Sequence, residues 1–252
     1  ILTLDYKRDG VVAKKSWFFI DDAVVCLGAG IVSQNECPIN TTINQCLLDG
    51  PVAIASGDGR LIELPKESEK KCADVAWLWH DDVGYLMLQP TDLYVAAKNV
   101  AGSWKHVCTS RSDSPSKKDV FTAWIDHGVK PDGGSYAYAI LPNAAKEPVK
   151  GVDFEVLRNS PELQVVCDTK NDRLLAVFPK PGEFEAPSGA KLSAGNPCVL
   201  AVRYSDGKPV GIDCCDPTRK LEKVSGAMDG TIPFSFTMPK GESQNHAVSY
   251  SK

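Results

Sequence analysis

The sequence lacks the long apolar runs and the excess of positive charge that mark two broad classes of protein. No apolar run approaches the roughly 18 residues that a helix needs to span a bilayer. The 28 Lys and Arg residues are outnumbered by 32 Asp and Glu residues, so the net charge is −4. Because nucleic acids and anionic membranes attract basic surfaces, we expect neither of them to be a partner of this chain.

Helical patterns and metal-ligand patterns are also scarce. Only residues 91–99 have a pattern that fits a short helix, and it fits a strand as well. No Cys-x-x-Cys pair occurs, and the four His residues show no zinc-ligand spacing against the nine Cys residues. A buried free Cys packs like a small apolar residue, so we expect most of these thiols to be structural. The sequence therefore predicts no metal and no cofactor.

Short apolar runs separated by turn residues are abundant, which is typical of an all-β protein. These runs predict strands that include residues 16–20, 23–28, 42–48, 75–80, 83–87, 121–127 and 136–141. The pair Asp81-Asp82 lies between two of the runs and predicts a tight hairpin turn. The sequence therefore predicts antiparallel sheets with almost no helix.

A polar, Pro-containing stretch without periodicity, residues 143–151, predicts a boundary between two units, residues 1–150 and 151–252. Further strand-like runs follow it at residues 154–157, 163–168, 174–178, 198–204 and 210–214. The second unit has the size and strand number of a small β-sandwich. Its Pro- and Gly-rich residues 179–195 predict a long surface loop.

Two sequence neighbourhoods place a carboxylate beside an imidazole, His80-Asp81-Asp82 and Asp126-His127, as a general base requires. Successive residues of a strand point to opposite faces, so we interpret both as strand-end residues that bond to turns. Gly28-Ala29-Gly30 lacks the third glycine and the helix of a nucleotide-binding loop. G-x-S-x-G and H-E-x-x-H motifs are absent. From the residues alone we predict no catalytic residue in this chain.

Five tryptophans offer aromatic faces on which sugar rings could stack. Trp17, Trp77 and Trp124 lie in apolar runs and are expected in the core, whereas Trp104 is flanked by polar residues. We therefore predict Trp104 as the substrate-binding residue. The basic pair Lys14-Lys15 could meet an acidic sugar, but we interpret it as a solvated pair.

The run at residues 16–20 has apolar side chains on both faces, because Trp17 and Phe19 alternate with Phe18 and Ile20. Apolar residues on both faces are typical of a strand that is covered on both sides. We therefore predict that Trp17 is a packing residue.

Residues 14–31 resemble a segment of polysaccharide lyase family 8, the family of the chondroitin, hyaluronate and xanthan lyases; they read KKSWFFIDDAVVCLGAGI. Other stretches are similar to family motifs in the same order: TTINQ (41–45), WHDDVGY (79–85), IDHG (125–128), YAYAILPN (136–143), FEVLRN (154–159) and CDPTR (215–219). The likeness extends over roughly residues 10–225.

The resemblance implies an enzyme of three parts: an N-terminal α/α toroid, a central antiparallel super-sandwich and a small C-terminal β-sandwich. Residues 1–150 correspond to the end of the super-sandwich and residues 151–252 to the C-terminal sandwich. The family cleaves uronate-containing polysaccharide by β-elimination, with Asn, His, Tyr and Arg from the toroid and Glu from an earlier stretch of the central domain. His80 and His127 align with scaffold strands, and the calcium site of some members also lies in the earlier stretch.

The resemblance therefore implies that the catalytic residues lie outside this chain. It also implies that an acidic polysaccharide is the substrate of the parent enzyme, that the toroid is a partner, and that the protein is secreted or periplasmic. One alternative is a non-catalytic carbohydrate-binding or scaffolding β-module. Another, a mutarotase-like enzyme on a related fold, needs an acid–base pair that the sequence does not supply.

Overall fold

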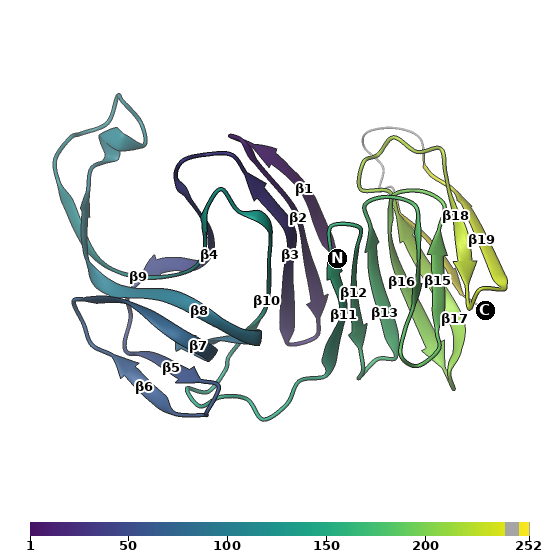
Figure 1. Ribbon diagram of the computed structural model, residues 1–252, viewed down its shortest axis with the longest axis horizontal. Helices are drawn as coiled ribbons and strands as arrows, with labels where there is room; N and C mark the ends of the chain where they lie inside the picture. Colours follow the sequence, from purple (N-terminus) through teal and green to yellow (C-terminus); the bar gives the residue numbers. More distant parts are fainter. Residues whose placement is uncertain (240–246, 252) are drawn as a thin grey trace. The chain divides into compact units, whose positions relative to one another are not determined.

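A computed structural model describes residues 1–239 and the backbone of residues 247–251. In this part of the chain, twenty β-strands and one short 3₁₀ helix form, so the all-β prediction is confirmed (Figure 1). Among these residues no helix is long and apolar enough to cross a membrane.

The chain divides into two compact units. The first unit comprises residues 1–32, 132–137 and 151–252, and the second comprises residues 33–131 and 138–150. Strand β10 (Asp132–Pro142) contributes residues to both units. This grouping follows contacts in space, whereas the division expected at residue 150 follows the order of the sequence, and that division stays a prediction.

The second unit is built from antiparallel strands. Their bounds are β4 (Pro38–Leu47), β5 (Val52–Ser56), β6 (Leu61–Leu64), β7 (Ser68–His80), β8 (Val83–Gly102) and β9 (Ser116–Val129). Strand β8 pairs with β7 and β9, β9 pairs with β4, and β5 lies between β6 and β7. Residues 91–99 continue β8 and do not form a helix.

The predicted β7–β8 hairpin is confirmed, and it packs around one tryptophan. Asp81 and Asp82 form its turn with φ of 49° and 56°, the left-handed backbone that two-residue hairpins need. Trp77 is buried, and a side chain at Gly84 would place its Cβ 2.0 Å from the Trp77 ring. The indole Nε1 of Trp77 donates to the carbonyl of Lys146 at 2.9 Å, which ties residues beyond β10 to this hairpin.

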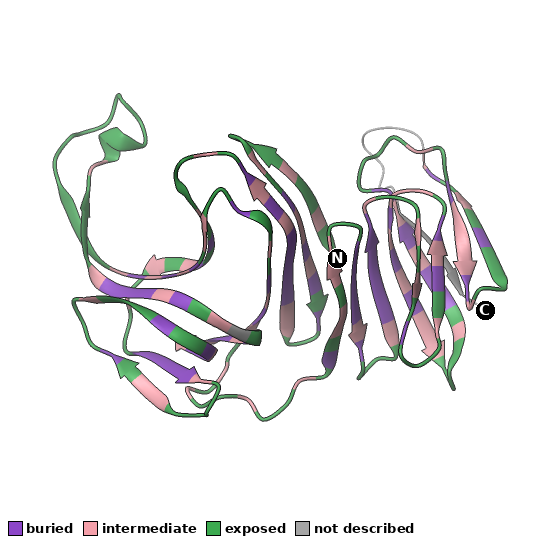
Figure 2. Cartoon of the chain, in the orientation of Figure 1, coloured by how far each residue is buried: buried purple, intermediate pink, exposed green. Residues whose placement is uncertain are grey.

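In the first unit, strands β1 (Leu2–Arg8), β2 (Val11–Ile20) and β3 (Ala23–Ser33) are neighbours in that order. On β2, Phe18 and Ile20 on one face are buried, whereas Phe19 on the other face is 59% exposed. The neighbouring edge strand β1 is exposed or half-buried along its length (Figure 2). The prediction that β2 is covered on both sides is therefore wrong for Phe19. Leu2, which pairs with half-buried Trp17, is also exposed, so this end of the face is open, whereas Ala13 farther along the same face is buried.

The rest of the first unit is a sandwich of two antiparallel sheets. One sheet has the strand order β11-β12-β13-β16-β17-β20, and the other has the order β14-β15-β18-β19. The bounds are β11 (Phe154–Ser160), β12 (Leu163–Asp168), β13 (Arg173–Phe178), β14 (Gly182–Glu185), β15 (Lys191–Ala194), β16 (Cys198–Ser205), β17 (Lys208–Cys215), β18 (Lys223–Met228), β19 (Ile232–Thr237) and β20 (Ala247–Ser251).

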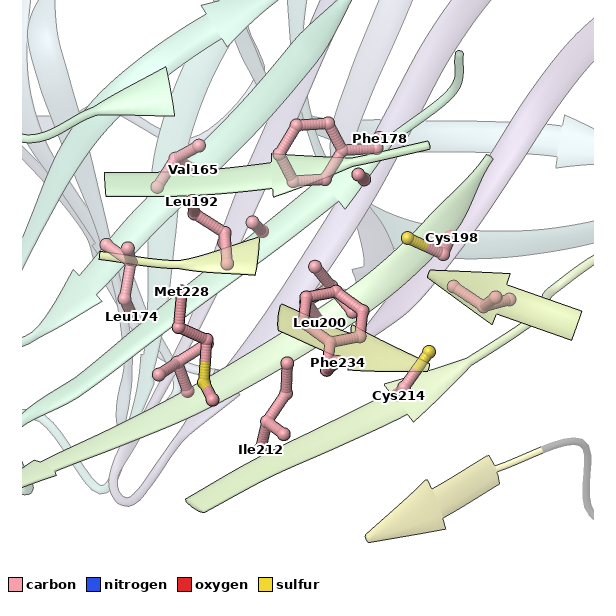
Figure 3. Close-up of a cluster of buried hydrophobic side chains, with 14 of the residues drawn as sticks. Val165, Leu174, Phe178, Leu192, Cys198, Leu200, Ile212, Cys214, Met228 and Phe234 are labelled. Carbon is pink, nitrogen blue, oxygen red and sulfur yellow. The ribbon is translucent and has the colours of Figure 1, made fainter. Parts of the chain in front are cut away.

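Inward-facing apolar side chains of both sheets form the sandwich core. Val165, Leu200 and Ile212 from one sheet meet Leu192 and Phe234 from the other (Figure 3). The prediction of one long loop over residues 179–195 is wrong, because β14 and β15 lie within it. Their pairing brings buried Leu192 opposite Phe184, so burial outweighs the local Pro and Gly content.

A buried polar network joins β2, β3 and β10 to the sandwich, and we call it the junction network. Ser16 Oγ donates to Gln164 Oε1 at 2.6 Å, and Gln164 Nε2 donates to Asn159 Oδ1 at 2.8 Å. Asn159 Nδ2 then donates to the carbonyls of Gly28 (3.2 Å) and Tyr136 (3.0 Å). Buried polar groups are tolerated when they are hydrogen-bonded, and each of these side chains is.

Candidate functional site

Strands β8 and β9 extend together as a long hairpin in the second unit and present Trp104 at its end. The paired part runs from Tyr94 opposite Trp124 to Gly102 opposite Ser116. The 3₁₀ helix η1 (Trp104–His106) follows β8 directly, and in Figure 1 it lies at the free end of this hairpin. We call residues 102–118 the hairpin tip.

Local hydrogen bonds fix the backbone around Trp104 and leave its ring in solvent. The carbonyl of Trp104 accepts the N–H groups of Val107 (3.1 Å) and Cys108 (2.9 Å). Across the loop, Asp113 accepts a hydrogen bond from Ser103 Oγ at 2.9 Å and pairs with Lys105 Nζ at 3.1 Å. Trp104 is 66% exposed, so its ring face is open to a ligand.

The hairpin tip is basic in a chain that is acidic overall. It contains four Lys or Arg residues and one Asp, against a net charge of −4 for the whole sequence. Lys105 is paired with Asp113, while Arg111, Lys117 and Lys118 are exposed. These three residues were not predicted as binding residues from the sequence. The four basic residues within residues 105–118 could have indicated a basic surface there.

The other tryptophans are held by packing. Trp77 is buried, as predicted, and Trp79 Nε1 donates to the carbonyl of Ala144 at 2.8 Å. The half-buried Trp124 stacks on Tyr94 with ring centroids 5.3 Å apart. Trp104 is therefore the tryptophan with the most accessible ring, as the sequence suggested, and its binding role stays a prediction.

Each candidate histidine contacts a group other than the carboxylate next to it in the sequence. His80 is buried, and its Nε2 accepts the backbone N–H of Asp49 at 3.1 Å. His127 Nε2 lies 2.9 Å from Thr41 Oγ1, while Asp126 accepts the N–H of Gly128 at 2.8 Å. The interpretation as a strand-end residue that bonds to a turn is confirmed for His80, which ends β7, but His127 lies within β9 and its contact Thr41 lies within β4.

The structure brings one further pair together, Cys46 and His80, with Sγ and Nδ1 3.7 Å apart. Burial raises the pKa of the Cys46 thiol and lowers the pKa of His80. Both groups are therefore neutral at pH 7, and a neutral thiol is a poor nucleophile. The His80 ring also stacks on Phe121 at 4.5 Å, so this pair is a packing contact.

The basic pair of the first unit is half-buried, so it is less solvated than we expected. Lys14 pairs with Asp5 at 2.9 Å. Lys15 Nζ lies over the rings of Tyr6 (5.7 Å) and Tyr136 (5.8 Å), and burial lowers its pKa. Because both side chains are engaged within the fold, they are poor candidates for binding an acidic sugar.

Buried tyrosines are equally unsuited to proton abstraction. Burial raises the pKa of Tyr85 to about 12 and also raises the pKa of Tyr136.

Among the residues that the structure describes, no group of three or more His, Cys, Asp or Glu side chains could hold a metal ion. Of the candidate groups considered in the described residues, those of the hairpin tip are exposed and are not used in packing.

Comparison with known proteins gives two consecutive family matches. The profile described as polysaccharide lyase family 8, super-sandwich domain, matches residues 1–152, and that of the family's C-terminal beta-sandwich domain matches residues 155–225. Chondroitinase-AC of Pedobacter heparinus is 37% identical over 222 residues, which is 86% of this chain and 31% of that enzyme.

Two further proteins extend the comparison. Xanthan lyase of Bacillus sp. strain GL1 is 29% identical over 67% of this chain and 19% of its own length. A solved structure of chondroitinase AC lyase superposes with a TM-score of 0.88 and 29% identity, over 98% of this chain and 37% of that one. The chain thus spans a third or less of the two curated relatives.

Proposed function

Because the chain belongs to polysaccharide lyase family 8, as its motifs indicated, we propose that it forms the β-sheet portion of an enzyme that cleaves uronate-containing polysaccharide by β-elimination. The observation that carries this proposal is the pair of consecutive domain matches, residues 1–152 and 155–225. Their order is the one expected of the end of a super-sandwich followed by a C-terminal β-sandwich. The names of the relatives, chondroitinase and xanthan lyase, support an acidic polysaccharide as the substrate class.

The proposal places the catalytic groups outside this chain. β-Elimination needs a base near the uronate C5 proton and a group that neutralises the uronate carboxylate. Here His80 Nε2 accepts the backbone N–H of Asp49, His127 Nε2 contacts Thr41 Oγ1, and burial raises the pKa values of Tyr85 and Tyr136. These groups therefore support the fold, and an N-terminal α/α toroid is the partner that supplies the chemistry.

The hairpin tip is the part of this chain that we assign to the polysaccharide. The exposed face of Trp104 can stack on the C–H face of a pyranose ring, and Arg111, Lys117 and Lys118 can pair with carboxylate or sulfate groups. The polymer is extracellular, so the protein acts outside the cytoplasm, as a secreted or periplasmic enzyme. The alternative, a carbohydrate-binding or scaffolding module, shares this tip and differs in having no catalytic partner.

A chimera tests the proposal. The matching segment of Pedobacter heparinus chondroitinase-AC is replaced by this chain, and formation of unsaturated uronate from chondroitin is measured. We expect activity within about tenfold of the parent enzyme, because the chemistry comes from the retained part. Trp104→Ala in the chimera should raise KM and leave kcat unchanged, since binding and not proton transfer is lost. A folded chimera that binds chondroitin without eliminating it would contradict the proposal.

A further inference from the structure

The hairpin tip keeps its shape without an apolar core. No residue from 102 to 118 is buried, and the strand ladder of β8 and β9 ends at Gly102 opposite Ser116. Beyond that pair the two arms of the tip are joined by polar contacts, such as the backbone N–H of Lys105 donating to the carbonyl of Ser112 at 3.2 Å. The position of Trp104 therefore depends on polar contacts between the arms.

Asp113 makes the side-chain contacts that hold the arms together on both sides of Trp104. Its Oδ1 accepts a hydrogen bond from Ser103 Oγ at 2.9 Å, and its Oδ2 accepts one from Lys105 Nζ at 3.1 Å. Ser103 and Lys105 are the two sequence neighbours of Trp104, so a single carboxylate holds both of them. We call Ser103, Lys105 and Asp113 the tip clamp.

The tip clamp also determines which basic groups are open to a polymer. The ammonium group of Lys105 is paired with Asp113, so the two charges largely balance one another. Arg111, Lys117 and Lys118 are exposed and carry the remaining positive charge of the tip. Lys105 is thus engaged within the loop, and the other three basic residues face the solvent.

A carboxylate in a basic tip has two opposing effects on the binding of an acidic polymer. Its charge repels the polymer, so on charge alone its removal should raise the affinity. Its contacts restrict the arms around Trp104 before the polymer arrives, which lowers the conformational entropy that binding has to remove. An exposed ion pair adds little to overall stability, so this second effect is expected in binding and not in unfolding.

Given the proposed function, on which this inference rests, we propose that Asp113 is a positioning residue for polysaccharide binding. It acts through Ser103 and Lys105, which hold the backbone on both sides of Trp104 and so present the ring to the polymer. Positioning outweighs repulsion, because the charge of Asp113 is already balanced by Lys105. Loss of Asp113 should therefore weaken binding of an acidic polysaccharide, even though it makes the tip more basic.

Calorimetric titration of the full chain with chondroitin, at low and at high salt, tests the proposal. We expect Asp113→Ala to weaken binding about fivefold, and the loss should persist at high salt, where charge effects are screened. Ser103→Ala changes no charge and should weaken binding about threefold. Asp113→Asn keeps an oxygen that accepts from Ser103 Oγ, so its affinity should lie between those of Asp113→Ala and the wild type.

Asp119→Ala is the matched control. Asp119 is another exposed carboxylate of the β8–β9 hairpin, but it accepts from Asn99 Nδ2 at 2.7 Å and lies outside the tip clamp. Its removal makes the same change in charge as Asp113→Ala and leaves the clamp in place. We therefore expect Asp119→Ala to bind chondroitin as tightly as the wild type or more tightly.

A measurement on the free chain separates positioning from contact with the polymer. The heteronuclear NOE of the Trp104 backbone amide should be lower in Asp113→Ala than in the wild type, since the loop gains fast motion before any ligand is present. The melting temperature should be the same in both proteins, because the clamp is exposed.

Tighter binding by Asp113→Ala, unchanged affinity in Ser103→Ala, an equal loss of affinity in Asp119→Ala or an unchanged amide NOE would each overturn the proposal alone. Absence of binding by the wild-type chain would overturn it together with the assignment of the hairpin tip to the polysaccharide. Because Ser103→Ala removes one hydroxyl from a half-exposed loop residue, it decides the outcome even where Asp113→Ala fails to fold.

Discussion

The junction network and the hairpin tip use similar residues in opposite ways. At the junction, Ser16, Gln164 and Asn159 bond to one another and to backbone carbonyls, with Ser16 and Gln164 buried and Asn159 half-buried. At the tip, Asp113 fixes the loop from within, while Trp104 and Arg111 face solvent. A polar or aromatic residue is available for recognition only where the fold does not already use it. The comparison therefore separates residues that hold the fold from residues that can meet a ligand.

The largest effect is expected at the junction. Asn159→Ala removes the donor to two buried carbonyls and the acceptor of Gln164, so three groups lose their partner. We expect the free energy of unfolding to fall by about 3 kcal/mol or more, measured by chemical denaturation. Asn99→Ala, at an exposed position, is the control and should change it by less than about 1 kcal/mol. Equal losses of unfolding free energy in Asn159→Ala and Asn99→Ala would show that the junction network does not stabilise the fold more than an exposed position does.

A smaller loss of stability is expected when the pH falls and His80 takes up a proton. Burial holds the pKa of His80 below its usual value of 6.5, so the unfolded chain takes up a proton more readily than the folded one. Stability due to neutral His80 is therefore fully present above pH 6.5 and is lost as the pH falls through that value toward the folded-state pKa. The melting temperature followed against pH should show this loss.

Two variants assign that pH dependence. His80→Gln should flatten the loss of stability on the acid side, because the titrating imidazole is gone. His106→Gln, on the exposed 3₁₀ helix of the hairpin tip, should leave the profile as it is in the wild type. A profile that is unchanged in His80→Gln would show that burial does not set the behaviour of this imidazole.

The smallest effect on stability is expected at the hairpin tip. Trp104→Ala removes an exposed ring, so the free energy of unfolding should change by less than about 0.5 kcal/mol. Affinity for chondroitin, measured by calorimetry, should nevertheless fall about tenfold or more, because the stacking face is lost. Trp124→Ala, which removes a ring stacked on Tyr94, should show the reverse pattern. Unchanged affinity in Trp104→Ala would show that the ring of Trp104 does not bind the polysaccharide.

Local patterns in the sequence predicted the local features of this fold. A short strand-like run predicted residues 163–168 as a strand, and β12 has those bounds. Asp81-Asp82 predicted a turn whose left-handed backbone the structure shows. The polar neighbours of Trp104 predicted its exposure. Each of these features is decided within a few residues, which is why the sequence was sufficient.

Features that depend on distant segments could not be predicted in this way. Asn159 bonds to the carbonyl of Gly28, 131 positions away, and no local pattern encodes that contact. The alternation around Phe19 indicates an apolar face but not whether a layer covers it.

Under the proposed function, this chain supports the parent enzyme and contacts its acidic polysaccharide, while the elimination chemistry lies elsewhere. The most direct test is to incubate the folded, isolated chain with chondroitin, hyaluronan and xanthan, and to follow the absorbance of unsaturated uronate. We predict saturable binding of at least one polymer and no product from any of them. Turnover by the isolated chain that is abolished by His127→Ala would contradict the account.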